Sequence, residues 1–157
     1  MEISIQLDKN KSKINLMDTS KIEHLLQQKQ VKSTAMRNLV LQYFLDIKKA
    51  IDLKELEKAF HYADRTTLFR TIKTFKDKGV IHEIKDGSNS TKYALCNEAC
   101  TSENHIDIHP HFYCEKCKET TCLRKISVPS ITIGNDFTIH STNLIIKGIC
   151  KLCNSVA

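Results

Sequence analysis

Apolar residues recur at three- and four-residue spacing along four stretches in the first half of the chain. This spacing puts them on one face of a helix, so the pattern predicts four amphipathic helices. The predicted helices cover residues 19–30, 34–47, 52–60 and 64–78. Side chains that accept hydrogen bonds stand where three of these helices begin, so Ser33 or Thr34, Asp52 and Asp64 are the predicted N-caps. Gly79 then marks the end of the fourth helix.

Two strand-like segments follow the fourth helix, VIHEIK at residues 80–85 and TKYAL at residues 91–95. They flank the turn-forming sequence Asp-Gly-Ser-Asn-Ser, which predicts a β-hairpin. Three short helices, a longer fourth helix and a hairpin form the order of elements found in a winged helix-turn-helix. We therefore predict that fold for residues 19–95, preceded by a flexible polar arm at residues 1–18.

The chain becomes rich in loops and strand-like segments after Cys96. The strand-like segments lie at residues 111–114, 126–128, 130–133, 137–140 and 144–150. Pro129 and Gly134 argue against a long helix among them. The prediction for the whole chain is an α+β protein in which residues 96–157 form a second, cysteine-rich domain.

The two predicted domains differ in charge. Residues 1–95 contain 18 lysines and arginines against 12 acidic residues, whereas residues 96–157 contain six of each. The whole formal charge of +6 therefore belongs to the first part, which suits contact with an anion such as DNA. A surface of solvated lysines would give the same excess, so charge alone leaves both interpretations open.

No stretch of the chain approaches the ~18 apolar residues that indicate a transmembrane helix. The first residues also lack the apolar core of a signal peptide. We therefore expect a cytoplasmic protein with no membrane partner. In that reducing compartment, cysteines favour metal binding over disulfides.

All seven cysteines lie in the second domain, and four of them form two Cys-x₂-Cys pairs. The pairs are Cys114 with Cys117 and Cys150 with Cys153, separated by 32 residues. Each pair presents two thiolates from one tight turn, and four thiolates complete a tetrahedral Zn²⁺ site. Four protein ligands leave no open position, so we predict a structural zinc. Two disulfides or four reduced thiols are the alternatives.

The predicted fourth helix has an apolar face and a polar face. Leu68, Ile72 and Phe75 share the apolar face, which we expect to pack in a core. The other side carries side chains that can contact bases or phosphates: Arg65, Thr66, Thr67, Phe69, Arg70 and Lys73. This face suits the major groove of DNA, with Lys85 and Lys92 of the hairpin held against backbone phosphates. An ordinary amphipathic helix with a solvated basic face is the alternative.

Several short motifs occur in the order typical of one protein family. They are Thr34-Ala-Met-Arg37, Thr67-Leu-Phe-Arg-Thr71, Gly79-Val-Ile-His82, His109-Pro-His111 and Gly148-Ile-Cys150. On these motifs the chain resembles the ferric uptake regulator family over residues 19–157. The resemblance implies a winged-helix DNA-binding domain, a C-terminal α/β dimerisation domain, and a homodimer that binds double-stranded operator DNA when loaded with metal. It also implies that Arg37 and Arg70 contact DNA, with Phe69 in the place of the family's tyrosine.

A second set of metal ligands is predicted where the two domains meet. His109 and His111 are two residues apart, so both point to the same side of a strand. His82 and Cys96 complete a Cys/His₃ set that suits a tetrahedral, regulatory Zn²⁺. The set is similar to that of the zinc uptake regulator branch, where a Tyr-x-x-Cys cysteine and a His-x-His pair bind the regulatory zinc. Taken singly, a surface histidine or a buried cysteine is the simpler reading of His82 or Cys96.

The iron and peroxide branches of the family use a carboxylate-rich site and a histidine near the third helix. Ala50 stands near the place of that histidine, and Cys122 stands in the place of a common acid, which favours a softer metal than Fe²⁺. The prediction is a zinc-dependent repressor of zinc-uptake genes that holds up to two Zn²⁺ per chain. An iron- or peroxide-sensing repressor is the alternative, and the roles of Cys100, His105, Cys122 and His140 stay open.

Two other classes of protein also contain zinc. A zinc hydrolase or deaminase needs an open metal position and a nearby general base. The chain has neither a His-Glu-x₂-His motif nor a His-x-Glu paired with Pro-Cys-x₂-Cys, so we expect no enzyme. A zinc-ribbon adaptor for other proteins would bind no DNA as a purified dimer, which separates it from a repressor.

Overall fold

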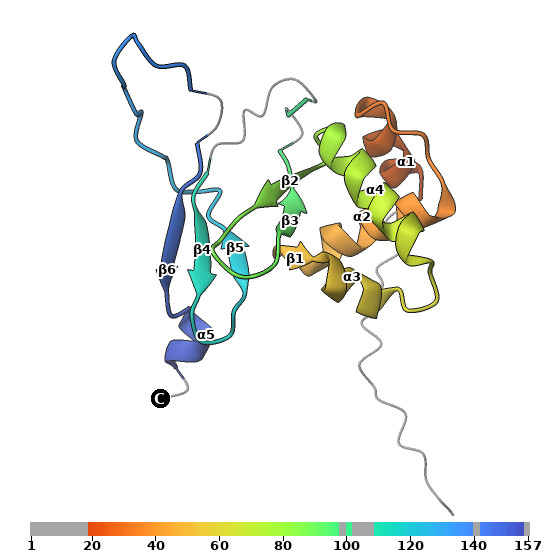
Figure 1. The fold of residues 1–157 in the computed structure, drawn as a ribbon. Coiled ribbons are helices and arrows are strands. Elements are labelled where there is room, and N and C mark those ends of the chain that lie inside the picture. Colours follow the sequence, from red (N-terminus) through yellow and green to blue (C-terminus); the bar gives the residue numbers. More distant parts are fainter. Residues whose placement is uncertain (1–18, 98–99, 102–108, 140–141, 156–157) are drawn as a thin grey trace, which may run out of the picture.

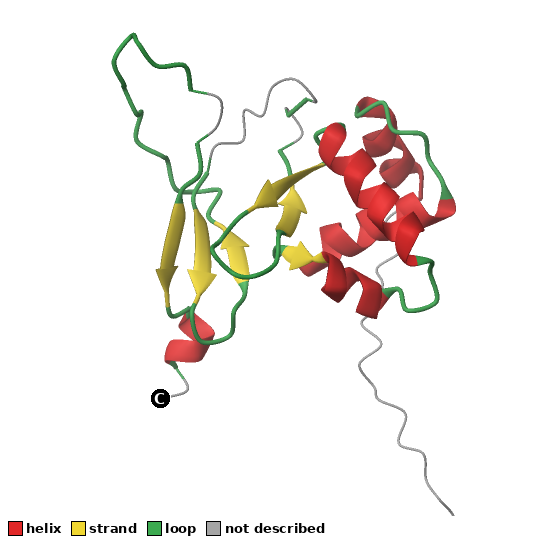
Figure 2. Cartoon of the chain, in the orientation of Figure 1, coloured by secondary structure: helices red, strands yellow, loops and turns green. Residues whose placement is uncertain are grey.

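The computed structural model describes residues 19–97, 100–101, 109–139 and 142–155 (Figure 1). The four longer helices gather on one side and most of the strands on the other, with a hairpin between them, and a short fifth helix lies at the end of the strands near the C-terminus (Figure 2). This mixture of helices and sheets confirms the predicted α+β class. The predicted arm at residues 1–18 lies outside the described residues, as do His105 and His140.

The four predicted helices are present, each within two residues of its predicted bounds. They are α1 (Thr19–Gln28), α2 (Ala35–Ile47), α3 (Leu53–Ala59) and α4 (Arg65–Asp77). Side chains cap the last three, because Thr34, Asp52 and Asp64 each accept a hydrogen bond from the backbone N–H three residues later. After α4, Gly79 adopts a φ of +65°, and a Cβ there would lie 2.8 Å from the carbonyl oxygen of Thr101.

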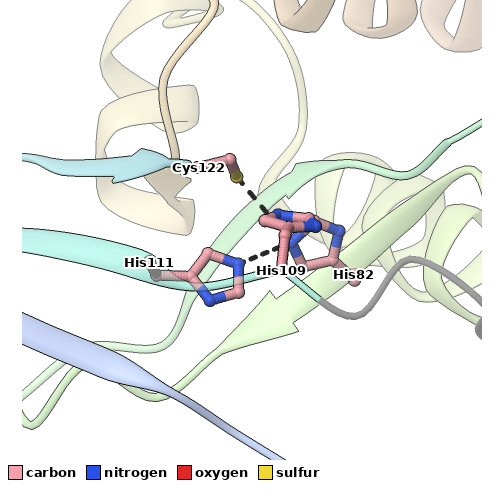
Figure 3. A group of neighbouring side chains, drawn as sticks. All are labelled: His82, His109, His111 and Cys122. Carbon is pink, nitrogen blue, oxygen red and sulfur yellow. Dashed lines mark hydrogen bonds between the residues drawn. The ribbon is translucent and has the colours of Figure 1, made fainter. Parts of the chain in front are cut away.

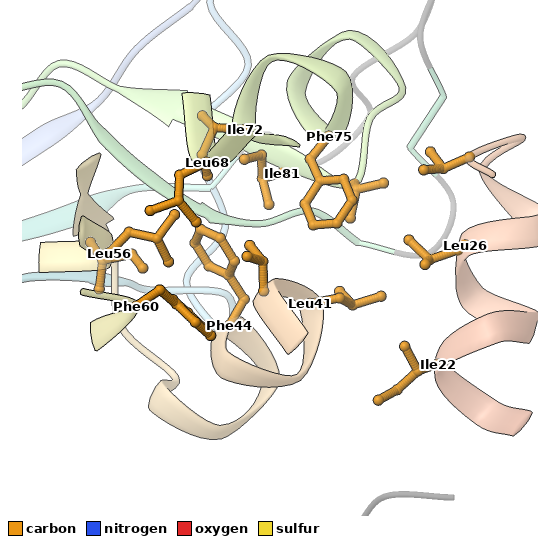
Figure 4. Close-up of a cluster of buried hydrophobic side chains, with 14 residues drawn as sticks. Ile22, Leu26, Leu41, Phe44, Leu56, Phe60, Leu68, Ile72, Phe75 and Ile81 are labelled. Carbon is orange, nitrogen blue, oxygen red and sulfur yellow. The ribbon is translucent and has the colours of Figure 1, made fainter. Parts of the chain in front are cut away.

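The apolar faces of the four helices meet in one core (Figure 4). Leu26 of α1 and Phe44 of α2 are among its fully buried side chains. The predicted apolar face of α4, with Leu68, Ile72 and Phe75, is buried in the same core. Because each such side chain contributes roughly 1.5–3 kcal/mol when fully buried, the core holds α4 with its opposite face outward.

A small antiparallel sheet lies next to the helices and has the strand order β1-β3-β2. Its strands are β1 (Ile51–Asp52), β2 (Ile81–Ile84) and β3 (Lys92–Leu95). The hairpin β2–β3 is the predicted wing. Strand β1 did not stand out in the hydrophobic pattern, because its two residues lie directly before α3 and gain strand geometry only by pairing with β3.

A second sheet, with strand order β5-β4-β6, forms the cysteine-rich part of the chain. It contains β4 (His111–Cys114), β5 (Thr120–Cys122) and β6 (Ile145–Gly148), and the one-turn helix α5 (Lys151–Asn154) follows. Strands β4 and β6 are parallel. The strand-like segments at 126–128 and 130–133 and the described part of 137–140 form no strand, because within the described residues none of them pairs with either sheet.

A buried ion pair joins the wing to the second sheet. Asp86 and Lys92, at the two ends of the wing turn, lie 3.0 Å apart with side chains 0% and 10% exposed. The Thr120 hydroxyl of β5 donates to the Asp86 carboxylate, and the Lys92 ammonium donates to Thr120 Oγ1 at 2.9 Å and to the Lys118 carbonyl at 2.5 Å. The backbone N–H of Ala50 also donates to the Thr120 carbonyl at 3.0 Å. The two sheets are therefore tied by polar contacts, of which those of Thr120 with Asp86 and Lys92 are buried.

Burial and hydrogen bonding act on Asp86 in opposite directions. Burial raises the pKa of its carboxyl, but hydrogen bonds from Ser88, Thr120 and Lys92 outweigh burial and leave the pKa below its ordinary value. The group is therefore a carboxylate at neutral pH. Lys92 is itself buried, and its ammonium is paired with Asp86 inside the protein. This contradicts the expectation that Lys92 holds a DNA phosphate.

We expect Asp86→Ala to lower the free energy of unfolding by about 3–5 kcal/mol, because it leaves the Lys92 ammonium buried without its carboxylate. Urea unfolding of the metal-loaded protein would measure this change. The exposed Asp136 offers a matched control, and Asp136→Ala should change stability by less than about 0.5 kcal/mol. Equal stability of the two variants would show that the ion pair does not hold the sheets together.

The Asp86 carboxylate also makes the free energy of unfolding depend on pH in the acidic range. Since the pKa of Asp86 is lower in the folded protein than in the unfolded chain, its contribution is complete above the unfolded value of about 3.9 and is lost as the pH falls. The stability difference between wild type and Asp86→Ala should therefore shrink below about pH 4.

Candidate metal centres and nucleic-acid interface

The parallel pairing of β4 with β6 brings the two Cys-x₂-Cys pairs together. Cys114 ends β4 and lies opposite Gly148 of β6, so the turn after each strand starts at the same end of the sheet. Cys117 lies in the turn between β4 and β5, and Cys150 and Cys153 lie at the start of α5 and within it. We call these four residues the Cys₄ cluster.

The four sulfurs of the Cys₄ cluster all lie within 4.8 Å of one another. The sulfurs of Cys117 and Cys150 are 3.9 Å apart, close to the edge of about 3.8 Å that Zn–S bonds of about 2.3 Å give in a tetrahedron. All four cysteines of the cluster are free thiols in the structure, in the arrangement expected for a metal site and not for the alternative of two disulfides. The donor set therefore fits a tetrahedral metal ion of the zinc type.

Hydrogen bonding within the Cys₄ cluster favours one thiolate and opposes others. The backbone N–H groups of Cys117 and Cys150 hold the pKa of the Cys114 thiol at about 6. Hydrogen bonding with Cys150, together with burial, raises the pKa of Cys153 to about 12. Crowded sulfurs cannot all ionise without a cation among them, which is the electrostatic condition that a divalent metal ion satisfies.

A second group of donors lies where the wing meets the second sheet (Figure 3). His82 comes from β2, His109 lies two residues before β4, His111 begins β4, and Cys122 ends β5. Their donor atoms all lie within 4.8 Å of one another. We call these four residues the His₃Cys cluster.

The His₃Cys cluster has the dimensions of a metal site. Nε2 of His82 lies 3.0 Å from Nε2 of His111 and 3.9 Å from the sulfur of Cys122. Tetrahedral zinc, with Zn–N near 2.1 Å and Zn–S near 2.3 Å, would place such donors about 3.4–3.6 Å apart. His109 and His111 are only 6% and 5% exposed. Buried imidazoles that converge on one point suit a transition metal better than a hydrated Mg²⁺ or Ca²⁺.

The membership of this cluster differs from the predicted set in one residue. His82, His109 and His111 were expected together and lie together, but the group contains Cys122 where Cys96 was predicted. The strand register explains the difference, since His111 and Cys122 are direct cross-strand partners of β4 and β5. Cys96 lies beside the cluster, with its sulfur 3.7 Å from Nδ1 of His82. Pairing registers are not visible in the sequence, which is why the sequence left open whether Cys122 joins these histidines.

The outward face of α4 carries most of the residues expected to meet DNA. Those on α4 are all exposed: Arg65, Thr66, Thr67, Phe69, Arg70 and Lys73. Two of them pair with acids, since Arg65 contacts Glu57 at 2.8 Å and Lys73 contacts Asp77 at 2.9 Å. Arg70 forms no ion pair with the residues that the structure describes, and Phe69 is 53% exposed beside it. An uncovered aromatic ring next to an available guanidinium suits a groove of DNA.

Arg37 lies in the first turn of α2 and contacts the turn that precedes this helix. It is half-buried, and its Nη1 donates to the Lys32 carbonyl at 2.8 Å. This contact fixes the turn that leads into α2, and the remaining guanidinium donors can still reach a phosphate.

Within the described residues, no helix is both long and apolar enough to cross a membrane.

Comparison with known proteins agrees with this architecture. The model of the Ferric uptake regulator family matches residues 28–149. The chain is 24% identical over 136 residues to the "Peroxide-responsive repressor PerR" of Staphylococcus aureus strain USA300, covering 82% of this chain and 86% of that protein.

Solved structures show the same fold at low identity. A zinc uptake regulator in complex with zinc and DNA superposes with a TM-score of 0.61 and 19% identity, covering 93% of this chain and 98% of that one. The ferric uptake regulator of Vibrio cholerae superposes with a TM-score of 0.56 and 16% identity, covering 82% of this chain and 98% of that one. With the family match extending from α1 through β6, this protein belongs to the ferric uptake regulator family.

Proposed function

We propose that this protein is a zinc-dependent transcriptional repressor that binds operator DNA as a homodimer. The observation that carries the proposal is the His₃Cys cluster, which takes His82 from the wing and its other three donors from the second sheet. Membership in a family of transcription regulators supports the regulatory role. The similar fold of a zinc uptake regulator with zinc and DNA bound supports DNA as the partner.

The path from the His₃Cys cluster to the DNA-binding face is short. When bound, a zinc ion supplies a cross-link between His82 and the donors of the second sheet. His82 follows Val80 and Ile81, both of which are buried in the core with Phe75 of α4. Val80 also donates its N–H to the Phe75 carbonyl at 2.8 Å. The position of His82 relative to the second sheet therefore sets the direction in which α4 presents Arg70.

In a homodimer this coupling would decide whether two α4 helices match two half-sites of an operator. Holding His82 favours one arrangement of wing and second sheet over others, which is a shift in population. By linkage, DNA would then tighten metal binding by the same factor by which metal tightens DNA binding. The Cys₄ cluster has no open ligand position, so its proposed role is to hold β4, β5 and α5 together.

Zinc fits the His₃Cys cluster better than iron does, because three imidazoles and a thiolate form a borderline-soft, tetrahedral donor set. The proposed targets are accordingly genes for zinc uptake. The likeness to a peroxide-responsive repressor supports a second candidate, an iron- or peroxide-sensing repressor. Such a sensor would respond to Fe²⁺ and would be inactivated by peroxide through oxidation of a ligand.

A metal titration of DNA binding tests the proposal. Operator fragments would first be selected from genomic DNA with the zinc-loaded protein. Protein freed of labile metal should then bind them weakly, and Zn²⁺ should tighten binding by at least about tenfold, equivalent to a coupling of about 1.4 kcal/mol. Equal affinity of the stripped and zinc-loaded protein would contradict the mechanism. A response to Fe²⁺ alone would favour the second candidate.

Arg70→Ala should weaken operator binding by about 1–3 kcal/mol and relax the base preference at one position, because the exposed guanidinium is the side chain best placed to grip a guanine edge. Circular dichroism and metal content should stay unchanged, since Arg70 lies outside the core. Lys125→Ala is a charge-matched control in the loop after β5 and should leave base preference unaltered. Equal losses in the two variants would indicate general charge attraction in place of specific contact.

Cys153→Ser should remove one tightly held zinc per chain, because three thiolates retain the metal far less well than four. Elemental analysis after mild chelation would measure the loss, and thermal unfolding should shift to lower temperature. Cys100→Ser is the control, since Cys100 belongs to neither cluster, and it should retain the metal. Unchanged zinc content in Cys153→Ser would exclude the Cys₄ cluster as a structural site.

A further inference from the structure

His82 lies between two sulfur atoms. Its Nε2 faces the His₃Cys cluster, 3.9 Å from the sulfur of Cys122 and 3.0 Å from Nε2 of His111. Its Nδ1 faces the sulfur of Cys96 at 3.7 Å. The two ring nitrogens of an imidazole point in widely different directions, so a metal ion bound at one of them cannot be bound at the other. Cys122 and Cys96 therefore face different nitrogens of His82, and a metal ion bound at one nitrogen is out of reach of the other.

Strand register explains how each sulfur reaches its place. His111 and Cys122 are direct partners across β4 and β5, so their side chains leave the same face of the second sheet. His82 is the partner of Ala94 across β2 and β3. Cys96 lies two residues beyond Ala94, so its side chain returns to the face of His82 as a diagonal neighbour. Its backbone N–H donates to the Val80 carbonyl at 2.9 Å, which keeps Cys96 in that position.

We propose that Cys122 supplies the only thiolate ligand of the His₃Cys cluster, and that Cys96 is a positioning residue that accepts a hydrogen bond from Nδ1–H of His82. This inference rests on the proposed function, in which that cluster holds the regulatory metal. A ligating histidine usually donates its other ring N–H to a nearby acceptor, which fixes the tautomer and the ring orientation. With its proton held at Nδ1 by Cys96, His82 presents the lone pair of Nε2 to the metal.

The assignment has a consequence for metal choice. On binding, the Cys122 thiol loses its proton to solvent and becomes a soft, anionic donor. One thiolate with three imidazoles favours Zn²⁺ or Co²⁺ over Mn²⁺ and Fe²⁺, which bind better to carboxylates. Specificity for the metal would then depend on Cys122, while the strength of binding would depend on both cysteines.

Cobalt spectroscopy separates the two cysteines without using DNA. Co²⁺ is added to full-length protein whose Cys₄ cluster keeps its zinc, as checked by elemental analysis, and the sulfur-to-cobalt charge-transfer band is followed. Wild type should show a band of one thiolate per bound cobalt. Cys122→Ser should lose that band. Cys96→Ala should keep the full band per bound cobalt but bind cobalt about 10–100-fold more weakly, as expected when the partner of a ligating histidine is removed.

Two further variants sharpen the result. Cys96→Ser retains an acceptor for Nδ1–H, so it should recover part of the affinity lost in Cys96→Ala. Cys122→Asp places a hard donor in the same position, so it should lose the band, retain a bound metal and shift preference towards Mn²⁺. Cys100→Ser should match wild type in both band and affinity.

Three outcomes would overturn the assignment. Loss of the band in Cys96→Ala with retention in Cys122→Ser would make Cys96 the ligand. A wild-type band of two thiolates would make both cysteines ligands, and no band at all would exclude thiolate coordination. If wild type bound no cobalt beyond the Cys₄ cluster, the proposed function would fail as well. If the bands behave as expected but zinc leaves operator binding unchanged, only the proposed function fails.

Discussion

The contact between the wing and the second sheet is the constraint on which the rest of the molecule depends. It combines a buried ion pair, Asp86 with Lys92, and two hydrogen bonds of Thr120 of β5, whose hydroxyl accepts from Lys92 and donates to Asp86. A small apolar patch lies beside it, where Ile84 of β2 meets Cys122 of β5. Burying charges is costly unless every group is paired, so this arrangement favours one relative placement of the two sheets. In that placement His82 lies within reach of His111 and Cys122.

Strand β4 connects the two metal centres within four residues. It begins with His111 of the His₃Cys cluster and ends with Cys114 of the Cys₄ cluster, about 10 Å away at the rise of a β-strand. The Cys₄ cluster anchors one end of β4, so the other end presents His109 and His111 from a fixed base. A rigid strand of this kind suits the proposed sensor role, because the free energy of metal binding would then act on the wing and would not distort the second sheet.

The sequence was a good guide wherever a local pattern controls structure. Helix bounds followed from the spacing of apolar residues and from caps such as Asp52 and Asp64. Proximity of the two sulfurs within each Cys-x₂-Cys pair followed from the spacing, whereas the parallel pairing of β4 with β6 brings the two pairs together. It was a poor guide wherever the outcome depends on which segments pair. Lys92 resembles a surface lysine in sequence but is buried against Asp86, and Cys122 gains a place beside His111 only through the register of β4 and β5.

The sequence by itself determined the α+β class, the four helices, the polar face of α4 and the two cysteine pairs, because each depends on residues close together in the chain. The tertiary structure decided which cysteine faces the histidines from inside their cluster and which faces His82 from outside it. Those positions depend on strand partners 11 to 12 residues apart and on the docking of two sheets. Such contacts are set by the packing of the whole chain, which no short sequence pattern contains.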